Sequence, residues 1–584
     1  MRQTGIPAIA TVVWNLALTV GAIGATRYVA TTGTDTGAGT SPEAPWRTIS
    51  YAVNHAADGD TVRVQGGRYL ENHYGPYGIY HEVNSGITIL GCDADWNESA
   101  APQDVYVETP EGATDSTVFL TGRVDGKSVT YRAITFVRTF GQTQVFRFVG
   151  ANAAHLVLDR CAIHAAPEGS CVHAVGVQPA TGGAGRRLTL NASTVECSGH
   201  AVSVTGAINA VEMTRCTLEP NRNAANAIHG FAWNAPVASL RFTDCTATYN
   251  VTATGYGLLD FRNANVASAV VSGGTWTSTA TNRGGFVLNA CSYAPSLRVT
   301  GATFHQSATT GQSICVAVGI DGYDNEHPVG SVSINNCRIT GNNSHTVLLG
   351  SGSDGAMFAD NTVISNGDLG VVVKGCNGVS VLRNRIVGVR PLYIKSARCT
   401  TVISNATCAS SGGALEFLRD SGRPAPTGNR VRYNIFDASG GGFAAIWDMT
   451  GGPGQTWQNQ IDSNAYVAGS AGLAKFGSDP ALTSLAELQA FWATGPWPND
   501  TASRVLDGCP YASTDPGCER FLCLRSWSLL ADYHDAWNWM PGVRQRPEPV
   551  GDFDDDGDVD LADFRGFQRC FNGPNRPPLC LPVE

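Results

Sequence analysis

The chain has 584 residues, of which 43% are hydrophobic and 15% charged, and its formal net charge is −10. Low charge combined with 67 glycines argues against both a disordered chain and a helical bundle. The acidic balance gives no support for nucleic-acid binding, which requires a basic surface. The composition therefore favours an all-β repeat protein.

Residues 1–25 have the features of an export signal. Arg2 precedes a largely apolar run from Ile6 to Ile23, which ends in small residues. Pro7 interrupts this run, which favours a cleaved signal over a membrane-spanning helix. We therefore expect a secreted or cell-surface protein with no membrane span in its mature chain.

Four short motifs follow the signal. They are Tyr28–Asp35 (YVATTGTD), Pro45–Ile49 (PWRTI), Gly59–Val62 (GDTV) and Gly66–Tyr69 (GGRY). As a set they resemble the N-terminal module of secreted right-handed β-helix proteins, such as polysaccharide lyase family nine and pectate-lyase-like proteins. The resemblance implies a right-handed parallel β-helix and an activity on polysaccharide.

Residues 46–57 predict a short amphipathic helix with Ile49, Val53 and Ala57 on one face. Such a helix would cover the open end of a solenoid, as terminal repeats require. A Gly-Asp turn then predicts a first strand over residues 61–65.

The middle of the chain contains a short repeat. Residues 370–374 (GVVVK) are followed by Asn384, and residues 392–395 (LYIK) by Asn405, so that matched positions are offset by 21. Short β-rich runs at this period, without a leucine-rich consensus, indicate a parallel β-helix. We predict an all-β, single-stranded right-handed parallel β-helix of about a dozen coils, which with its N-terminal cap spans residues 26–475.

One position in each coil is predicted to lie at a tight turn. Small polar or thiol side chains stacked there can bond to the backbone of the neighbouring coil or pack on one another, which is a structural role. We expect the thiols among them to be buried and free. The predicted turn positions are Ile134, Cys161, Ser193, Cys216, Cys245, Gly274, Ala302, Cys337, Asn361, Asn384, Asn405, Asn434 and Asn464.

Alternation within the repeated strand predicts which side chains enter the core. The inward positions are Val371, Val373, Leu392 and Ile394. The outward positions are Val372, Lys374, Tyr393 and Lys395. Because adjacent coils lie about 4.8 Å apart, the two lysines should be neighbours on the outer face.

The candidate catalytic residues lie on this outer face. If the next coil begins at Leu415, Glu416 stacks beside Tyr393, within reach of Lys395. The resemblance implies a lysine or arginine that removes the proton α to a uronate carboxylate, often assisted by calcium. A neighbouring ammonium group favours the neutral form of a lysine, which suits such a base. The candidates are Lys374, Lys395, Tyr393 and Glu416; the alternative is two solvated lysines with Glu416 as their counter-charge.

The calcium-binding aspartates that the resemblance implies cannot be matched residue by residue. The nearest carboxylates at strand exits are Asp260, Asp321 and Asp354. Asp321 opens a long loop (DGYDNEH, residues 321–327) that could hold calcium or line a groove. The alternative is a solvated loop.

Beyond about residue 476 the repeat stops. Residues 482–492 have helical apolar spacing with Ser484 as N-cap. We assign residues 476–543 to a C-terminal cap, because an open solenoid end must be covered; tryptophans of this segment could instead stack on sugar rings. The best disulfide candidates are the cluster Cys509, Cys518 and Cys523, for which a zinc site is the rival interpretation, and the pair Cys570 and Cys580.

Residues 544–550 form a linker by composition and lead into an acidic loop. Carboxylates at loop positions one, three, five, nine and twelve, with glycine at position six, match the spacing of a calcium loop. The predicted calcium site comprises Asp552, Asp554, Asp556, Asp558, Asp560 and Asp563. Residues 551–584 resemble one half of a dockerin module, which implies a cohesin-like partner, although a dockerin has two such halves.

Two functions of different class follow. The first is a carbohydrate-active enzyme, either a lyase or a hydrolase on acidic, uronate-containing polysaccharide. The second is a non-catalytic extracellular protein that binds glycans or builds the cell surface. The fold does not decide between them.

Overall fold

The computed structural model describes most of the chain between residues 24 and 511. Among the described residues, no helix has the length and apolar character needed to cross a membrane. The described ranges are 24–71, 85–108, 117–121, 126–138, 144–149, 153–165, 173–179, 185–220, 230–249, 257–261, 265–279, 286–290, 296–307, 314–319, 330–342, 344–449, 459–494, 499–508 and 510–511. Residues 1–23 of the export signal, Asp321, the five disulfide candidates, the linker and the calcium loop lie outside these ranges.

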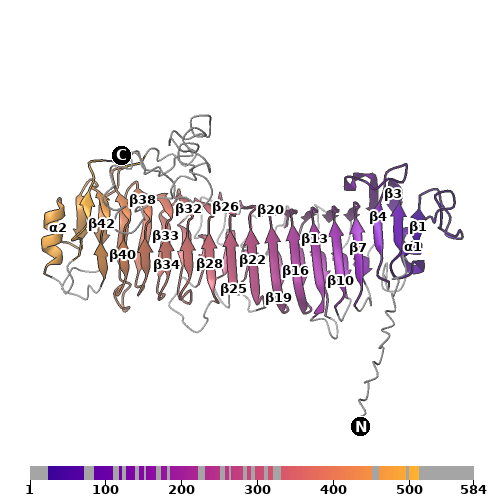
Figure 1. The fold of residues 1–584 in the computed structure, drawn as a ribbon, viewed down its shortest axis with the longest axis horizontal. Helices are drawn as coiled ribbons and strands as arrows, with labels where there is room; N and C mark the ends of the chain where they lie inside the picture. The colour runs from indigo at the N-terminus through magenta and orange to yellow at the C-terminus, as the bar shows by residue number, and fades with distance from the viewer. Residues whose placement is uncertain are drawn as a thin grey trace, which may run out of the picture.

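Parallel strands stack along a rod in successive coils (Figure 1). The first sheet has 16 strands. They are β1 (Thr26–Val29), β2 (Thr61–Val64), β4 (Thr88–Gly91), β7 (Ser128–Arg132), β10 (His155–Asp159), β13 (Arg187–Asn191), β16 (Ile208–Thr214), β19 (Val237–Thr243), β22 (Ser268–Ser272), β25 (Ser296–Thr300), β28 (Val332–Asn335), β31 (Met357–Ala359), β34 (Ser380–Leu382), β37 (Thr401–Ile403), β40 (Arg430–Arg432) and β43 (Gln460–Asp462).

The second sheet also has 16 strands. They are β3 (Gly67–Leu70), β5 (Val105–Glu108), β8 (Thr135–Arg138), β11 (Ala162–Ala165), β14 (Thr194–Cys197), β17 (Thr217–Glu219), β20 (Thr246–Tyr249), β23 (Thr275–Ser278), β26 (Thr303–Gln306), β29 (Arg338–Gly341), β32 (Thr362–Ser365), β35 (Arg385–Gly388), β38 (Ala406–Ala409), β41 (Ile435–Asp437), β44 (Ala465–Val467) and β46 (Arg504–Val505).

The third side of the rod is divided into two sheets. A five-stranded sheet contains β6 (Thr117–Thr121), β9 (Gln144–Phe148), β12 (His173–Val177), β15 (His200–Val204) and β18 (Phe231–Trp233). A nine-stranded sheet contains β21 (Leu259–Asp260), β24 (Leu288–Ala290), β27 (Ile314–Val318), β30 (His345–Leu349), β33 (Leu369–Lys374), β36 (Arg390–Lys395), β39 (Gly413–Leu418), β42 (Ala444–Asp448) and β45 (Gly472–Phe476).

The predicted all-β parallel architecture is confirmed, but the coils are more numerous than the predicted dozen. The difference arises at the N-terminal end, where β2 and β4 of the first sheet and β3 and β5 of the second precede the first predicted turn position. One continuous hydrophobic core fills the rod from Val29 to Trp492.

A ladder of buried asparagines joins the later coils at the predicted turn positions. The Asn361 amide N–H donates to Asn384 Oδ1 (2.9 Å), and the Asn384 amide N–H donates to Asn405 Oδ1 (2.9 Å). Asn434 and Asn464 continue the series. The residue before each of these asparagines has a φ between 53° and 58°, which turns the chain from the first sheet to the second. The predicted structural role is confirmed.

A second asparagine ladder was not predicted. The Thr400 amide N–H donates to Asn429 Oδ1 (2.8 Å), and the Asn429 amide N–H donates to Asn459 Oδ1 (3.0 Å). Asn499 extends this ladder by accepting from the Ile461 amide at 3.1 Å. All three asparagines are buried. They satisfy backbone groups at a second corner of the coil, where unpaired groups would be costly.

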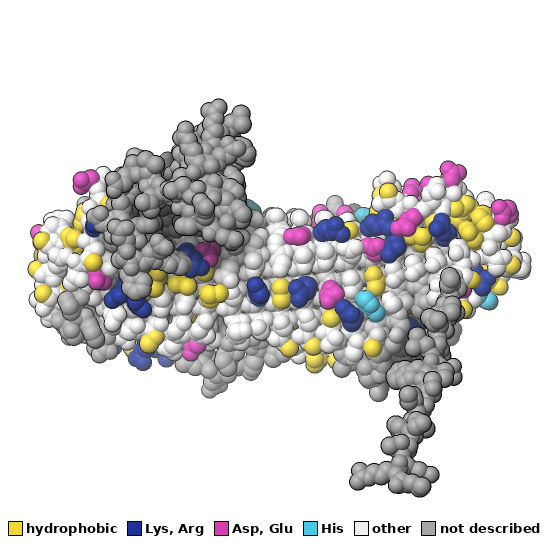
Figure 2. Space-filling view, viewed as in Figure 1, with side chains coloured by type: hydrophobic (Ala, Val, Ile, Leu, Met, Phe, Trp, Pro, Cys, Tyr) yellow, Lys and Arg dark blue, Asp and Glu magenta, His cyan; other side chains and the backbone are white. Residues whose placement is uncertain are grey.

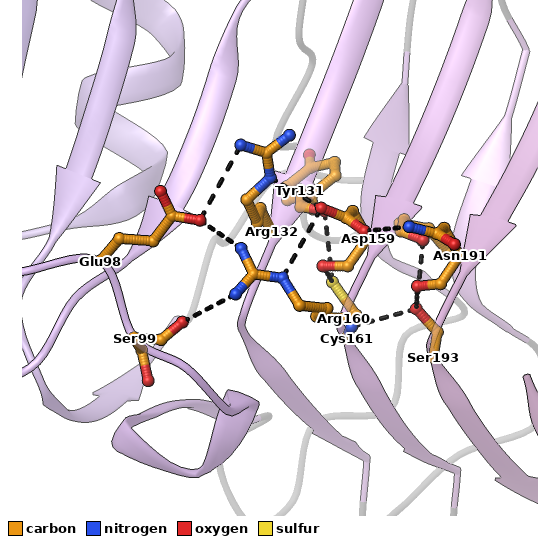
Figure 3. A network of polar contacts seen from close by, with 10 residues as sticks. Glu98, Ser99, Tyr131, Arg132, Asp159, Arg160, Cys161, Asn191 and Ser193 are labelled. Carbon is orange, nitrogen blue, oxygen red and sulfur yellow. Dashed lines mark hydrogen bonds and ion pairs between the residues drawn. The ribbon is translucent and has the colours of Figure 1, made fainter. Parts of the chain in front are cut away.

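Earlier coils use other small side chains at the same turn. Ser193 Oγ accepts from the Cys161 amide N–H at 3.0 Å and donates to the Leu158 carbonyl at 3.1 Å, which is the bonding that asparagine provides later (Figure 3). Cys161, Cys216 and Cys245 are buried free thiols, as predicted.

On the surface beside Cys161, charged side chains from several coils form a network (Figure 3). Asp159 accepts from Arg132 Nε (2.8 Å) and from Asn191 Nδ2 (2.6 Å). Glu98 contacts the guanidinium groups of Arg132 and Arg160. Because each carboxylate forms an ion pair with an arginine, this network links neighbouring coils and is not a free ligand site.

The N-terminal cap is a shorter helix than predicted. Helix α1 spans Ile49–His55, with Thr48 as N-cap accepting from the Tyr51 amide N–H. The helix ends before Ala57, which is exposed, because Ala56 adopts extended backbone at the C-cap. Ala52 takes the predicted place of Ala57 on the buried face. A 3₁₀ turn, η1 (Pro102–Asp104), precedes β5.

The C-terminal cap begins with helix α2 (Leu485–Trp492), and the predicted N-cap Ser484 is confirmed within a capping box with Glu487. Phe491 stacks on Phe476 of the last third-side strand, with ring centroids 4.1 Å apart. Figure 1 shows α1 and α2 at opposite ends of the rod.

A buried carboxylate ties α2 to the last coil. Asp500 accepts from Trp492 Nε1 (2.6 Å), the Tyr466 hydroxyl (2.6 Å) and Ser503 Oγ (2.7 Å). Burial raises the pKa of Asp500 to about 6, although these three hydrogen bonds lower it. The chain then adds β46 to the second sheet and places Tyr511 on the outer side of that sheet, where its hydroxyl donates to the Thr407 carbonyl.

Candidate functional site

The candidate residues lie on the third side of the rod, on strands β33, β36 and β39. Val371, Val373, Leu392 and Ile394 point into the core, as predicted. Val372 and Tyr393 belong to a separate apolar cluster, so they lie on the opposite side of the sheet. Both are nevertheless buried, with 1% and 5% of their surface exposed. Alternation therefore predicted the direction of these side chains but not their burial.

The two lysines are direct neighbours, as predicted: Lys374 of β33 and Lys395 of β36 are partners in the strand register. The carboxylate that meets Lys395 differs from the expectation. Lys395 Nζ lies 2.6 Å from Asp420 Oδ1, whereas Glu416 has its ion pair with Arg390. Asp420 lies in the segment that follows β39, so strand alternation gave no indication of it.

Glu416 stands beside Tyr393 in the register, as predicted, but it is fully buried. Its Oε1 accepts from the Gly413 amide N–H at 2.6 Å, and its Oε2 lies 3.9 Å from Arg390 Nη1. Oε2 has no hydrogen-bond partner among the described residues. Burial raises the pKa of Glu416 to about 7, against the lowering effects of the Gly413 N–H and Arg390. This carboxyl can therefore change its protonation near neutral pH, as functional groups often do.

Arg390 links Glu416 to a third coil. Its guanidinium donates to both carboxylate oxygens of Asp368, from Nε at 3.0 Å and from Nη2 at 2.9 Å. This fork geometry holds the cation at a fixed place on the surface. Asp368, Arg390 and Glu416 thus form a charged chain across three successive coils, with Asp368 half exposed and Glu416 buried.

Two glycines make room for Glu416. A Cβ atom at Gly412 would lie 2.5 Å from Glu416 Oε1, and one at Gly413 would lie 2.9 Å from both Glu416 Cγ and Trp447 Cβ. Any larger residue at these two positions would displace the carboxyl. Glycine at both positions is therefore required for Glu416 to occupy its buried position.

Tyr393 completes the group. Burial, followed by the neighbouring charge of Glu416, raises the pKa of Tyr393 to about 12. Its hydroxyl is therefore protonated at physiological pH and available as a hydrogen-bond or proton donor.

The other predicted carboxylates do not join this group. Asp260 occupies the same outward row of the nine-stranded sheet and is buried, but it lies at the far end of that sheet. Asp354 lies in an exposed turn, where it accepts from the Asn377 amide N–H at 2.7 Å. Within the described ranges, no group of three or more His, Cys, Asp or Glu side chains is arranged to hold a metal ion.

The protonation of Glu416 predicts a pH dependence of stability. Its pKa is about 7 in the folded chain and near 4.5 when solvated, so the folded state holds a proton that the unfolded chain releases between these values. The stabilisation is present below about pH 4.5 and lost as the pH rises through 7, about 3 kcal/mol in total. Glu416→Gln should flatten the fall in urea midpoint between pH 5 and pH 8. If the urea midpoint falls equally steeply with pH in both proteins, Glu416 is not the group responsible. Asp500, the other buried carboxyl with a raised pKa, is present in both proteins and contributes equally to both.

A family model described as the right-handed beta helix region matches residues 318–473. The fold is a right-handed parallel β-helix. No curated protein matches the sequence.

Several solved structures are similar to this chain at low identity. Tailspike protein 3 of bacteriophage CBA120 is 13% identical, with 84% of this chain and 62% of the tailspike covered and a TM-score of 0.36. The A-module of the mannuronan C-5 epimerase AlgE6 from Azotobacter vinelandii is 12% identical, with 78% and 93% covered and a TM-score of 0.30. Pectate lyase Pel9A is 12% identical, with 86% and 90% covered and a TM-score of 0.16. The chain thus spans less than two thirds of the tailspike, and likenesses of this size carry no argument about activity.

Proposed function

We propose that this β-helix protein cleaves an acidic, uronate-containing polysaccharide by β-elimination on the outer face of β33, β36 and β39. The observation that carries the proposal is the pair Lys374 and Lys395, in register on neighbouring strands, with Tyr393 and the buried Glu416 in register on β36 and β39. Elimination needs a base, a cation for the substrate carboxylate and a proton for the leaving oxygen.

The residues take different parts in this reaction. Lys395, held by Asp420, remains an ammonium group and neutralises the uronate carboxylate. Lys374 is the base that removes the proton α to that carboxylate; the electron pair of the broken C–H bond forms a carbon–carbon double bond, and the bond to the leaving oxygen breaks. Tyr393 gives its proton to that oxygen. Because Glu416 is fully buried, we assign it a positioning role through Arg390 and Tyr393.

The experiment is an ultraviolet assay for unsaturated product with the intact protein and a panel of acidic polysaccharides. Formation of unsaturated ends supports the proposal. Absence of unsaturated product with every acidic polysaccharide contradicts it. In that case the second candidate, a non-catalytic glycan-binding protein, takes its place; the near-complete burial of Tyr393 favours this candidate.

We further propose that residues 1–25 direct export and that the loop Asp552–Asp563 binds calcium. The supporting observation is the loop spacing, since five carboxylates at these positions repel one another without a cation. A lone loop lacks the partner that paired loops use to order each other, so we expect a Kd of about 10⁻⁴ to 10⁻³ M. A cohesin-like partner would bind only the calcium-loaded form.

Calorimetric titration of the full-length protein with calcium measures this affinity. The matched variant is Asp552→Ala with Asp556→Ala, which removes two ligands and leaves the β-helix unchanged. We expect binding heat with the intact chain and its loss in the variant. No heat at millimolar calcium, or the same heat in both proteins, means that the loop is not a calcium site.

A further inference from the structure

The first sheet has an outer face that the proposed reaction does not use. Between β13 and β28, its middle row of outward side chains runs in register across six strands. The row consists of Thr189, Glu212, Arg241, Val270, Arg298 and Ser333. The residues on either side of each point into the core, so these six face away from it.

Two arginines of this row are exposed cations. Arg241 and Arg298 lie two strands apart, which is about 9.6 Å at the usual strand spacing. The side chain between them, Val270, is short and uncharged. Arg187 stands at one end of the same face, where its Nη2 lies 3.4 Å from Glu212 Oε2. Dark blue side chains recur along the middle of the rod in Figure 2.

The charge of this face has the opposite sign to that of the whole chain, which is −10. From β2 to β43, seven arginines but only three carboxylates point outward from strands of the first sheet. The arginines are Arg63, Arg132, Arg187, Arg241, Arg298, Arg430 and Arg432; the carboxylates are Asp159, Glu212 and Asp462. This excess of outward arginines over carboxylates attracts a polyanion.

Rows of hydroxyl groups flank the arginines. On one side Ser239, Ser268 and Ser296 are in register, and Ser296 Oγ lies 2.9 Å from Ser331 Oγ. On the other side are Thr214, Thr243 and Ser272. Hydroxyl groups donate and accept, so they can exchange hydrogen bonds with sugar hydroxyls, while guanidinium groups bind carboxylates through two bonds.

We propose that this face is a docking track for an extended acidic polysaccharide, which lies lengthwise along the rod with its carboxylates on Arg241 and Arg298. The choice of polymer rests on the proposed function, but the binding surface is separate from the lysine pair. A track of this kind would hold a long substrate chain on the protein between cleavage events.

The test is calorimetric titration of the full-length protein with sodium polygalacturonate at low salt. The variant is Arg241→Ala with Arg298→Ala; the matched control, Arg47→Ala with Arg398→Ala, removes two exposed arginines from other surfaces. We expect about a tenfold rise in Kd for the variant, since two exposed charge contacts contribute about 1.4 kcal/mol together. The control should stay within about twofold. An unchanged Kd in the variant, or an equal rise in the control, overturns the proposal.

Two other probes separate the alternatives. Neutral dextran should bind at least tenfold more weakly than polygalacturonate, and duplex DNA should also bind more weakly. If either polymer binds as tightly as polygalacturonate, the face does not recognise an acidic sugar chain. The outcome is independent of catalysis. Weaker binding by the Arg241/Arg298 variant supports the track even if the intact protein forms no unsaturated product, and full binding by the variant overturns it even if cleavage is observed.

Discussion

Asn384→Ala should lower the free energy of unfolding by about 3 kcal/mol or more. The Asn384 side chain is fully buried and makes four hydrogen bonds: Oδ1 accepts from the amide N–H and from Nδ2 of Asn361, and Nδ2 donates to the Phe358 carbonyl and to Asn405 Oδ1. Alanine removes the side-chain partner of two backbone groups in the preceding coil, the Asn361 N–H and the Phe358 carbonyl, and an unpaired buried group costs about 1–3 kcal/mol.

Urea unfolding followed by circular dichroism measures this effect. Asn366→Ala is the matched control, because Asn366 is exposed and its side chain makes one bond, to Asn342 Oδ1 at 2.7 Å. The control should change stability by no more than about 0.5 kcal/mol. Equal, small effects of the two substitutions would show that the ladder does not hold the coils together.

Lys374→Ala should lower the rate of polysaccharide cleavage at least about a hundredfold, which is the usual contribution of a general base. Lys395→Ala should also impair cleavage, because the uronate carboxylate then loses the ammonium group that neutralises it. Neither substitution removes a core side chain, so the circular dichroism spectrum should stay that of the intact protein.

Lys127→Ala is the control for charge. Lys127 lies near the N-terminal end of the rod, where its Nζ is 2.9 Å from Asp58 Oδ2. Cleavage by this variant should equal that of the intact protein. If Lys374→Ala cleaves at the same rate as Lys127→Ala, the base lies elsewhere.

The coil could be predicted in detail where its repeat is regular. The offset of 21 that aligned Lys374 with Lys395 is the register of β33 and β36, and the same offset placed Asn384 and Asn405 in one ladder. The second ladder was not predicted; its last member, Asn499, lies 40 residues after Asn459 and beyond the point at which the predicted repeat stops.

The charged surroundings of the candidate site were less predictable. The same offset of 21 pairs Arg390 with Leu369, an apolar residue, so no repeated charge marked Arg390. Strand alternation fixes the side to which Glu416 and Tyr393 point, but their burial depends on contacts beyond the strand. The raised pKa of Glu416 is therefore a property of the folded site and not of the repeat.

Elimination at the lysine pair is tested by the ratio of unsaturated ends to new reducing ends in the products of the intact protein. Elimination creates one unsaturated end for each bond cleaved, so we predict a ratio of one, with both products lost together in Lys374→Ala. New reducing ends without unsaturated ends would show hydrolysis and contradict the claim.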